Sequence, residues 1–233
     1  MKPYISAYHY ILKKYQEKGK AFSILHLSDE YGTDFIDYYN LSMCKKVYRN
    51  YTRAFPESIA AKIVQLPLGY SKNLTIESAK LEQTRTLSWS LFATAWHNRH
   101  DVVKIIENIQ GTCEYKLFPT WNDPEQLDCN TYSDKLYSSI FVPCVRGNNL
   151  ETFRFYEALE CGAIPIYVKE ENDPFFSFVS EKLPIIALDN WHDALHFMKI
   201  LLRNREKLMQ YRTEILQKWK AWKEELKEGL AAL

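Results

Sequence analysis

Short apolar runs alternate with amphipathic stretches along most of the chain, and this alternation sets the predicted elements. In the second half, apolar runs of strand length lie at residues 87–94, 115–118, 139–143, 163–168 and 184–188. Stretches with helical spacing lie at residues 99–109, 133–137, 150–161 and 191–203, and a loop containing Phe175–Val179 follows the fourth run. Strands and helices in alternation predict a parallel sheet that helices cover on both faces.

The first part of the chain mixes the same two kinds of element. Residues 4–18 have helical spacing and end near Gly19, a residue suited to a helix C-terminus. Three short apolar runs, which predict strands, follow at residues 22–27, 47–51 and 63–68. Residues 70–86 are polar and predict a connection with one helical turn.

These patterns predict three parts. They are a small α/β domain at residues 1–80, a Rossmann-like α/β domain at residues 81–204, and a closing charged helix at residues 205–233. A length of 233 residues fits one large domain or two small ones. Because the first part is short for an independent doubly wound domain, we expect it to carry a reduced sheet.

Composition and charge exclude some classes of function. The chain is 46% hydrophobic and 25% charged, as is usual for globular proteins, and its net charge of +1 gives no support to a nucleic-acid or membrane-surface role. The five cysteines have no zinc or redox spacing, which favours a reducing compartment. Neither a signal peptide nor a transmembrane segment is visible, so we expect a cytoplasmic location.

The most informative stretch is residues 138–168, which predicts a strand, a polar loop, a helix and a second strand. Open α/β sheets bind ligands outside the carboxyl ends of their strands, where a helix N-terminus offers free N–H groups to phosphate. The loop at this position holds Arg146, Gly147, Asn148, Asn149, Glu151 and Thr152. The pattern therefore predicts a phosphorylated, nucleotide-like ligand.

Charged residues around this helix allow both structural and functional interpretations. Asn148 and Glu151 have capping-box spacing, which predicts that the helix begins just after Asn148 and gives Glu151 a structural role. Arg146, before the helix, and Arg154, one turn inside it, are each suited to a diphosphate because their guanidinium groups are planar donors. Glu157 lies three residues beyond Arg154, so these two could instead form an ion pair on the helix surface.

At these residues the chain resembles a known family. The donor-binding motif of exostosin-like glycosyltransferases, an inverting GT-B group, is similar to the segment RGNNLETFRFYEALECGAIPIYV. The Ser/Thr-x-Arg-x-x-Glu-Ala core of that family corresponds to Thr152, Arg154, Glu157 and Ala158. The ribitol-xylosyltransferase branch of the same superfamily is similar, in order and spacing, to the upstream pieces HLSDE, VYRNY, LPLGY and NRHDVV. The resemblance covers residues 22–190.

The resemblance implies a fold and an activity. The expected fold is α/β of the GT-B type, with a Rossmann-like parallel sheet in the C-terminal domain and a reduced α/β N-terminal domain. The expected activity is inverting transfer of a sugar, with xylose as the first choice, from a UDP-linked donor to a glycan or polyol hydroxyl. The resemblance also implies that Arg154 and Thr152 contact the diphosphate of the donor and that Glu157 contacts its ribose.

Further donor contacts are expected near this motif. Asn149 and Glu151 belong to the same loop as Arg146. Asn98 and Arg99 follow the first strand of the second half, where GT-B proteins commonly place phosphate contacts. An exposed helix start is an equally good interpretation of Arg99.

An inverting transfer needs a base that deprotonates the acceptor hydroxyl. Asp29 and Glu30 follow the apolar run at residues 22–27, at the strand end expected to face the cleft. Partial desolvation there would raise the basicity of a carboxylate, although a solvated loop pair is the alternative. We expect one of the two, first Asp29, to be the base, and we interpret His26 as a core residue.

Other kinds of chemistry have weaker support. The chain has no Asp-x-Asp metal motif, no Walker loop and no GxGxxG, and His192 and His196 share a helix face without a third ligand. We therefore expect no metal and no cofactor other than the donor itself. A non-catalytic nucleotide-sugar-binding partner subunit, favoured by the short first domain, and a nucleotide-sugar epimerase stay open as alternatives.

Overall fold

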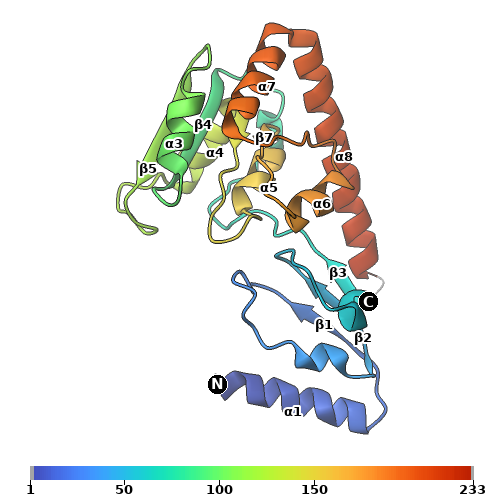
Figure 1. The fold of residues 1–233 in the computed structure, drawn as a ribbon. Helices are drawn as coiled ribbons and strands as arrows, with labels where there is room; N and C mark the ends of the chain where they lie inside the picture. Colours follow the sequence, from blue (N-terminus) through green and yellow to red (C-terminus); the bar gives the residue numbers. More distant parts are fainter. Residues whose placement is uncertain (1–2, 232–233) are drawn as a thin grey trace. The chain divides into compact units, whose positions relative to one another are not determined.

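The computed structural model describes residues 3–231 and divides the chain into two compact units, Met1–Leu68 and Gly69–Leu233 (Figure 1). Each unit is built on its own parallel sheet, with strand orders β1-β2-β3 and β5-β4-β6-β7. The predicted α/β class with parallel sheets is therefore confirmed. None of the helices within residues 3–231 combines the length and the apolar character needed to cross a bilayer.

The boundary between the units precedes the predicted one at residue 80, because the connecting segment is bonded to the second unit. Ser71 donates to Glu157 through both its backbone N–H and its hydroxyl. The backbone N–H of Glu77 donates to the hydroxyl of Tyr137 at 2.7 Å. The predicted third part also belongs to this unit, since the long final helix is counted within Gly69–Leu233.

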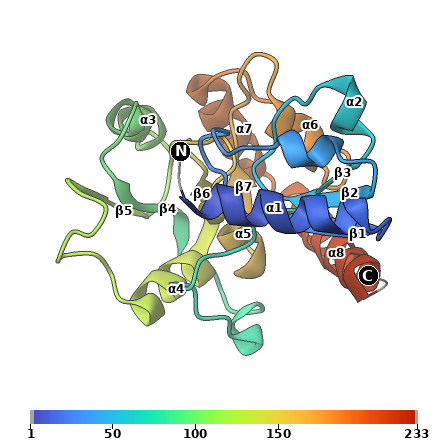
Figure 2. The ribbon, with the colours of Figure 1, turned by 90° about the horizontal axis from the view of Figure 1, so that it is seen from below.

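The first unit begins with a helix and continues with three short strands (Figure 2). Its elements are α1 (Pro3–Glu17), β1 (Phe22–His26), η1 (Asp37–Asn40), β2 (Cys44–Arg49), α2 (Glu57–Ala60) and β3 (Ile63–Gln65). The helix α1 ends as predicted, because Gly19 adopts φ +61° and its N–H donates to the carbonyl of Gln16 at 3.0 Å. The buried core of the first unit consists of Tyr39, Cys44, Val47 and Ile59, which join η1 and α2 to the strand β2.

The second unit carries the longer sheet and most of the helices. Its elements are η2 (Ser78–Lys80), β4 (Leu87–Thr94), α3 (Arg99–Ile106), β5 (Cys113–Phe118), α4 (Cys129–Ser138), β6 (Ser139–Pro143), α5 (Phe153–Glu160), β7 (Ile164–Ile166), α6 (Pro174–Ser180), α7 (Trp191–Arg203) and α8 (Arg205–Ala231). The strands β4 and β6 lie at the centre of the sheet and are almost wholly buried, as their continuous apolar runs predict. Figure 1 shows α8, in red, running beside α7.

Three predicted elements differ from the structure. Residues 175–179, predicted as loop, form α6, because Asp173 caps its first turn and Pro174 occupies its first position. Residues 184–188, predicted as a strand, pair with no strand among the described residues. The helix α5 begins at Phe153 rather than just after Asn148, since the side chain of Asn149 accepts from the N–H of Glu151 and holds a turn there.

Candidate donor site

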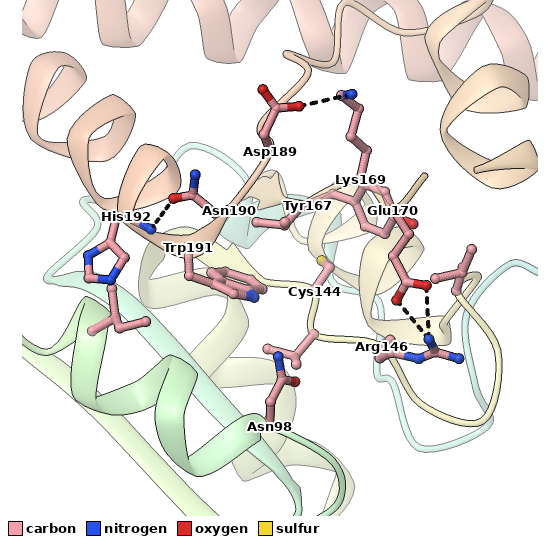
Figure 3. Close-up of a pocket in the computed structure, with 14 residues that line it drawn as sticks. Asn98, Cys144, Arg146, Tyr167, Lys169, Glu170, Asp189, Asn190, Trp191 and His192 are labelled. Carbon is pink, nitrogen blue, oxygen red and sulfur yellow. Dashed lines mark hydrogen bonds and ion pairs between the residues drawn. The ribbon is translucent and has the colours of Figure 1, made fainter. Parts of the chain in front are cut away.

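A pocket of about 390 Å³ lies in the second unit beyond the carboxyl ends of β6 and β7 (Figure 3). Its volume is in the range that small-molecule sites occupy. Side chains from four loops and helix starts line it, including Asn98, Arg146, Tyr167, Glu170, Trp191 and His192. The sheet topology explains this convergence, because the carboxyl ends of parallel strands meet at one edge.

Most of the polar side chains around the pocket are already paired with one another. Arg146 Nη1 contacts both carboxylate oxygens of Glu170, at 2.7 and 2.9 Å, and Lys169 Nζ lies 2.9 Å from Asp189 Oδ1. Figure 3 shows both pairs beside the pocket. The side chains of Arg146 and Glu170 are each about two-fifths exposed, so a ligand can reach them without unfolding of the loops.

Two further arginines, Arg99 and Arg154, bond to backbone carbonyls of β4, and Arg99 also bonds to the loop after β6. Arg99 is buried and donates to three carbonyls, those of Thr94 (2.8 Å), Val145 (3.5 Å) and Arg146 (2.9 Å). Arg154 Nη2 donates to the carbonyl of Phe92 at 2.8 Å. These bonds fix both guanidinium groups, but carbonyl oxygens do not neutralise their charge.

The two guanidinium groups also act on each other. Burial, and then the positive charge of Arg154, lower the pKa of Arg99 to about 10. In addition, the Nε atoms of Arg99, Arg146 and Arg154 are buried without a hydrogen-bond partner. Buried donors and like charges of this kind are costly unless an anion or another acceptor meets them.

Thr152 completes this cluster. It is the N-cap residue of α5, yet its side chain makes no capping bond, and its hydroxyl oxygen is buried without a partner. Gly147 lies alongside, because a Cβ built on it would lie 3.7 Å from Arg99 Nη2 and 3.9 Å from the Thr152 methyl. We call Arg99, Arg154 and Thr152 the arginine cluster. The cluster adjoins the pocket, because Arg99 donates to the carbonyl of Arg146 and Arg146 lines the pocket.

Glu157 has a different environment from the one expected for a ribose ligand. It is only 3% exposed, and Oε1 accepts from the N–H (3.2 Å) and hydroxyl (2.6 Å) of Ser71, while Oε2 accepts from the hydroxyl of Tyr132 at 2.6 Å. The alternative of an Arg154–Glu157 ion pair on the helix surface is wrong, because Glu157 is buried and its two oxygens bond to Ser71 and Tyr132. In this structure Glu157 ties the segment after Leu68 to the second unit.

Glu151 and Asn149 hold the loop in shape. Because the N-cap of α5 is Thr152, Asn148 and Glu151 do not form the predicted capping box of this helix. Glu151 is buried and accepts a 2.6 Å hydrogen bond from the hydroxyl of Tyr156, a contact that fits its structural interpretation. Asn149 accepts from the N–H of Glu151 at 3.0 Å. Neither residue lines the pocket, whereas the predicted residues Asn98 and Arg146 do.

In the first unit, Asp29 is the buried partner of an arginine. Its Oδ2 lies 3.0 Å from Arg49 Nη2 and 3.4 Å from Arg53 Nη1, and its Oδ1 accepts from the N–H of Asp34. Burial would raise the pKa of Asp29, but these hydrogen bonds and positive charges lower it overall. The raised basicity expected for Asp29 is therefore wrong; Glu30, the second predicted base, is half-buried.

His26 and its neighbours form a connected polar group. His26 Nε2 lies 3.1 Å from Asp34 Oδ2, and Nδ1 is bonded to the hydroxyl of Tyr39. Among the described residues, His26, Asp29 and Asp34 are the one set of side chains close enough together to hold a metal ion. Arg49 and Arg53 beside Asp29 oppose a further cation there, so we interpret the set as an ion-pair network.

Four polar residues of the pocket are not among the predicted site residues. Lys169, Glu170, Asp189 and Asn190 follow the apolar runs at residues 163–168 and 184–188. The rule that singled out the loop after residue 143 applies equally to the loops after those runs. Applied to those two loops, this rule predicts Lys169, Glu170, Asp189 and Asn190 as candidate site residues.

Comparison with known proteins supports this description of the fold. The RXYLT1 C-terminal domain family matches residues 70–233. A crystal structure of an alpha1,3-fucosyltransferase superposes with a TM-score of 0.50 at 12% identity, covering 86% of this chain and 66% of that one. A structure of alpha1,3-fucosyltransferase with GDP also gives 0.50 at 12%, covering 81% and 64%.

At this identity the likeness concerns the fold alone, and the chain spans about two thirds of the length of these enzymes. A search among curated protein sequences found no match. The predicted GT-B-type fold is confirmed by the two parallel sheets and by these structures. Because the family match covers the whole second unit except Gly69, the chain belongs to the RXYLT1 C-terminal domain family.

Proposed function

We propose that the chain is a glycosyltransferase whose second unit binds a nucleoside-diphosphate sugar, with UDP as the nucleotide. The pocket beyond β6 and β7 receives the nucleoside, and the arginine cluster receives the diphosphate. The transfer is inverting, xylose is our first choice of sugar, and the acceptor is a hydroxyl of a glycan or polyol. The family match and the glycosyltransferase fold support sugar transfer in general.

The observation that carries the proposal is a pair of neighbouring arginines at the carboxyl edge of the sheet, of which Arg99 is buried and Arg154 is half-buried. Arg99 and Arg154 are close enough for one charge to lower the pKa of the other, and both have buried Nε groups without partners. A diphosphate would accept from these donors and offset both charges, and the leaving diphosphate of a transfer reaction carries that same charge. We propose that these guanidinium groups supply the positive charge that a metal ion supplies in other transferases.

The nucleoside assignment follows from the pocket. Glu170 offers a carboxylate that can accept from vicinal ribose hydroxyls, and Arg146 connects it with the arginine cluster. Asn98, Asn190 and Trp191 offer polar and aromatic surface for a base. For the catalytic base we retain Glu30, since Asp29 has a lowered pKa and its carboxylate is held by Arg49.

Calorimetry with UDP and with uridine on three variants tests the proposal. Arg154→Ala and Thr152→Val should lower the affinity for UDP but leave the affinity for uridine nearly unchanged, because in the proposed complex the removed groups face the diphosphate. A charge-assisted hydrogen bond contributes about 1.5–3 kcal/mol, so the Arg154 variant should lose about 10- to 150-fold in UDP affinity. Arg205→Ala, which removes an exposed arginine of the same unit, is the matched control.

Equal losses for UDP and uridine in the Arg154 variant would contradict the diphosphate assignment. The alternative function is that of a non-catalytic subunit that binds a nucleotide sugar without transferring it. Release of UDP from UDP-xylose in the presence of an acceptor distinguishes the two. Nucleotide binding without any turnover would favour the binding subunit.

A further inference from the structure

Two tryptophans at the carboxyl edge of the second sheet form a stacked pair that the donor site does not use. Trp96 follows β4 and Trp121 follows β5, and their rings are nearly parallel, with an interplanar angle of 18° and centroids 5.8 Å apart. Trp121 is 61% exposed. Tryptophan is enriched at sites where one part of the ring packs on the protein and the rest meets a ligand or partner.

Backbone bonds hold the two loops of this pair together. The N–H of Ala95 donates to the carbonyl of Phe118 at 2.7 Å, so the chain leaves β4 and β5 side by side. The side chain of Gln126 bonds to the carbonyl of Trp121, and Lys116 Nζ lies 2.5 Å from Glu125 Oε2 at the base of the same loop. These bonds hold the loop that carries Trp121 in a defined conformation next to Trp96.

A backbone hydrogen bond connects Trp96 with Arg99 of the arginine cluster. The N–H of Arg99 donates to the carbonyl of Trp96 at 3.3 Å, and between them His97 adopts φ +52°, a left-handed conformation that is costly for a residue with a side chain. In the sheet order β5-β4-β6-β7, the nucleoside pocket lies toward β7 and the tryptophans lie toward β5. With the nucleoside in the pocket and the diphosphate on the arginine cluster, as proposed above, a sugar beyond the diphosphate would lie on the side of the tryptophans.

We propose that Trp96 and Trp121 form a platform for a pyranose ring of the acceptor glycan. One face of a pyranose presents C–H groups, which pack on the face of an indole ring, while hydroxyls at the ring edge bond to surrounding polar groups. Such groups are present in the same loop, where Asn122, Asp123 and Gln126 follow Trp121 in the sequence. The acceptor role rests on the proposed function, whereas the pyranose contact itself does not.

The same sheet provides an internal comparison. Trp89 of β4 and Tyr115 of β5 also stack, at 18° and 5.6 Å, but they lie in mid-strand rather than at the carboxyl edge. Tyr115 is 44% exposed. Because this pair has similar ring geometry far along the strands from the donor site, Tyr115→Ala is the matched control for Trp121→Ala.

Saturation-transfer NMR on the full 233-residue chain tests the platform, with xylotetraose and cellotetraose as pyranose probes and sorbitol as an acyclic polyol. The wild-type chain should transfer saturation to the pyranose ring protons and not to sorbitol. Trp121→Ala should weaken pyranose binding about 3- to 10-fold, Trp121→Phe by no more than about twofold, and Tyr115→Ala not at all. UDP calorimetry on the same variants should give unchanged affinities.

Unchanged pyranose binding in Trp121→Ala, or equal binding of sorbitol and the pyranose probes, would overturn the platform. So would the absence of pyranose binding by the wild-type chain, both to these probes and across a printed oligosaccharide array. Failure of UDP to bind, with pyranose binding still dependent on Trp121, would refute the proposed donor site and leave the platform standing. The two proposals therefore fail separately.

Discussion

At the residue scale, buried charges distinguish the two units. In the first unit, the buried charge is neutralised: Asp29, 4% exposed, pairs with Arg49, which is fully buried. In the second unit, the described bonds of Arg99 and Arg154 go to backbone carbonyls rather than to a carboxylate. The first arrangement stabilises a loop after β1, whereas the second is suited to bind an anion.

We expect Asp29→Asn to destabilise the first unit by about 3–5 kcal/mol near neutral pH, because it leaves Arg49 buried without its carboxylate. Folding lowers the pKa of Asp29 below its ordinary value of 3.8, so its contribution is complete above that pH. The contribution is lost as the pH falls below 3.8 toward the folded-state pKa. Denaturation of the wild-type and variant chains from pH 7 to pH 2 measures this difference.

The exposed carboxylate of Asp37 in the same unit provides the control, since Asp37→Asn should change the stability little at any pH in this range. If the difference in unfolding free energy between wild type and Asp29→Asn stayed constant down to pH 2, the charge of Asp29 would contribute nothing to the stability of the first unit.

At the element scale, the final helix α8 completes the core of the second unit. Trp219 packs against Tyr156 and Trp222, and its indole N–H donates to Glu160 Oε1 at 3.2 Å. Lys223 Nζ contacts both oxygens of the same carboxylate. The helix therefore anchors α5, the helix that carries Arg154 and has Thr152 as its N-cap.

We expect Trp219→Ala to destabilise the second unit by about 3–5 kcal/mol, since a large buried ring is removed and Glu160 loses a donor. Urea unfolding followed by tryptophan fluorescence and circular dichroism measures the loss. Lys220→Ala, on the exposed side of the same helix, should have a small effect. Equal stabilities of these two variants would mean that α8 is not part of the core.

At the scale of the whole molecule, the chain consists of two units with separate sheets, and the candidate donor site lies within one of them. Arg99, Arg146, Thr152 and Arg154 all belong to Gly69–Leu233. The nucleotide should therefore stabilise the units unequally.

We expect saturating UDP to slow hydrogen exchange in the second unit and to leave the exchange of β1, β2 and β3 unchanged. At a ligand concentration of about one hundred times the dissociation constant, the stabilisation is about 2.7 kcal/mol for the unit that binds. Hydrogen-exchange mass spectrometry with and without UDP checks the distribution. Equal protection of both units would indicate that the first unit also contacts the nucleotide.

Local patterns predict much of this fold and part of the site. The strands at residues 87–94 and 139–143 and the helix at residues 191–203 have the predicted bounds, because apolar periodicity and buried runs are properties of neighbouring residues. The position of Arg146 and Asn98 at the pocket follows from the same patterns, since a strand followed by a loop places its polar residues at the carboxyl edge.

Other features depend on residues far apart in the chain. Glu157 bonds to Ser71, and Arg99 lies near Arg154, and no local pattern reveals either contact. The pairing of Arg146 with Glu170 likewise exists only once β6 and β7 lie side by side. The sequence by itself determined the alternation of elements and the motif at Thr152 and Arg154, because propensity and periodicity act over a few residues. The tertiary structure alone decided which carboxylates are neutralised and which arginines keep their charge, because burial and long-range contacts set both.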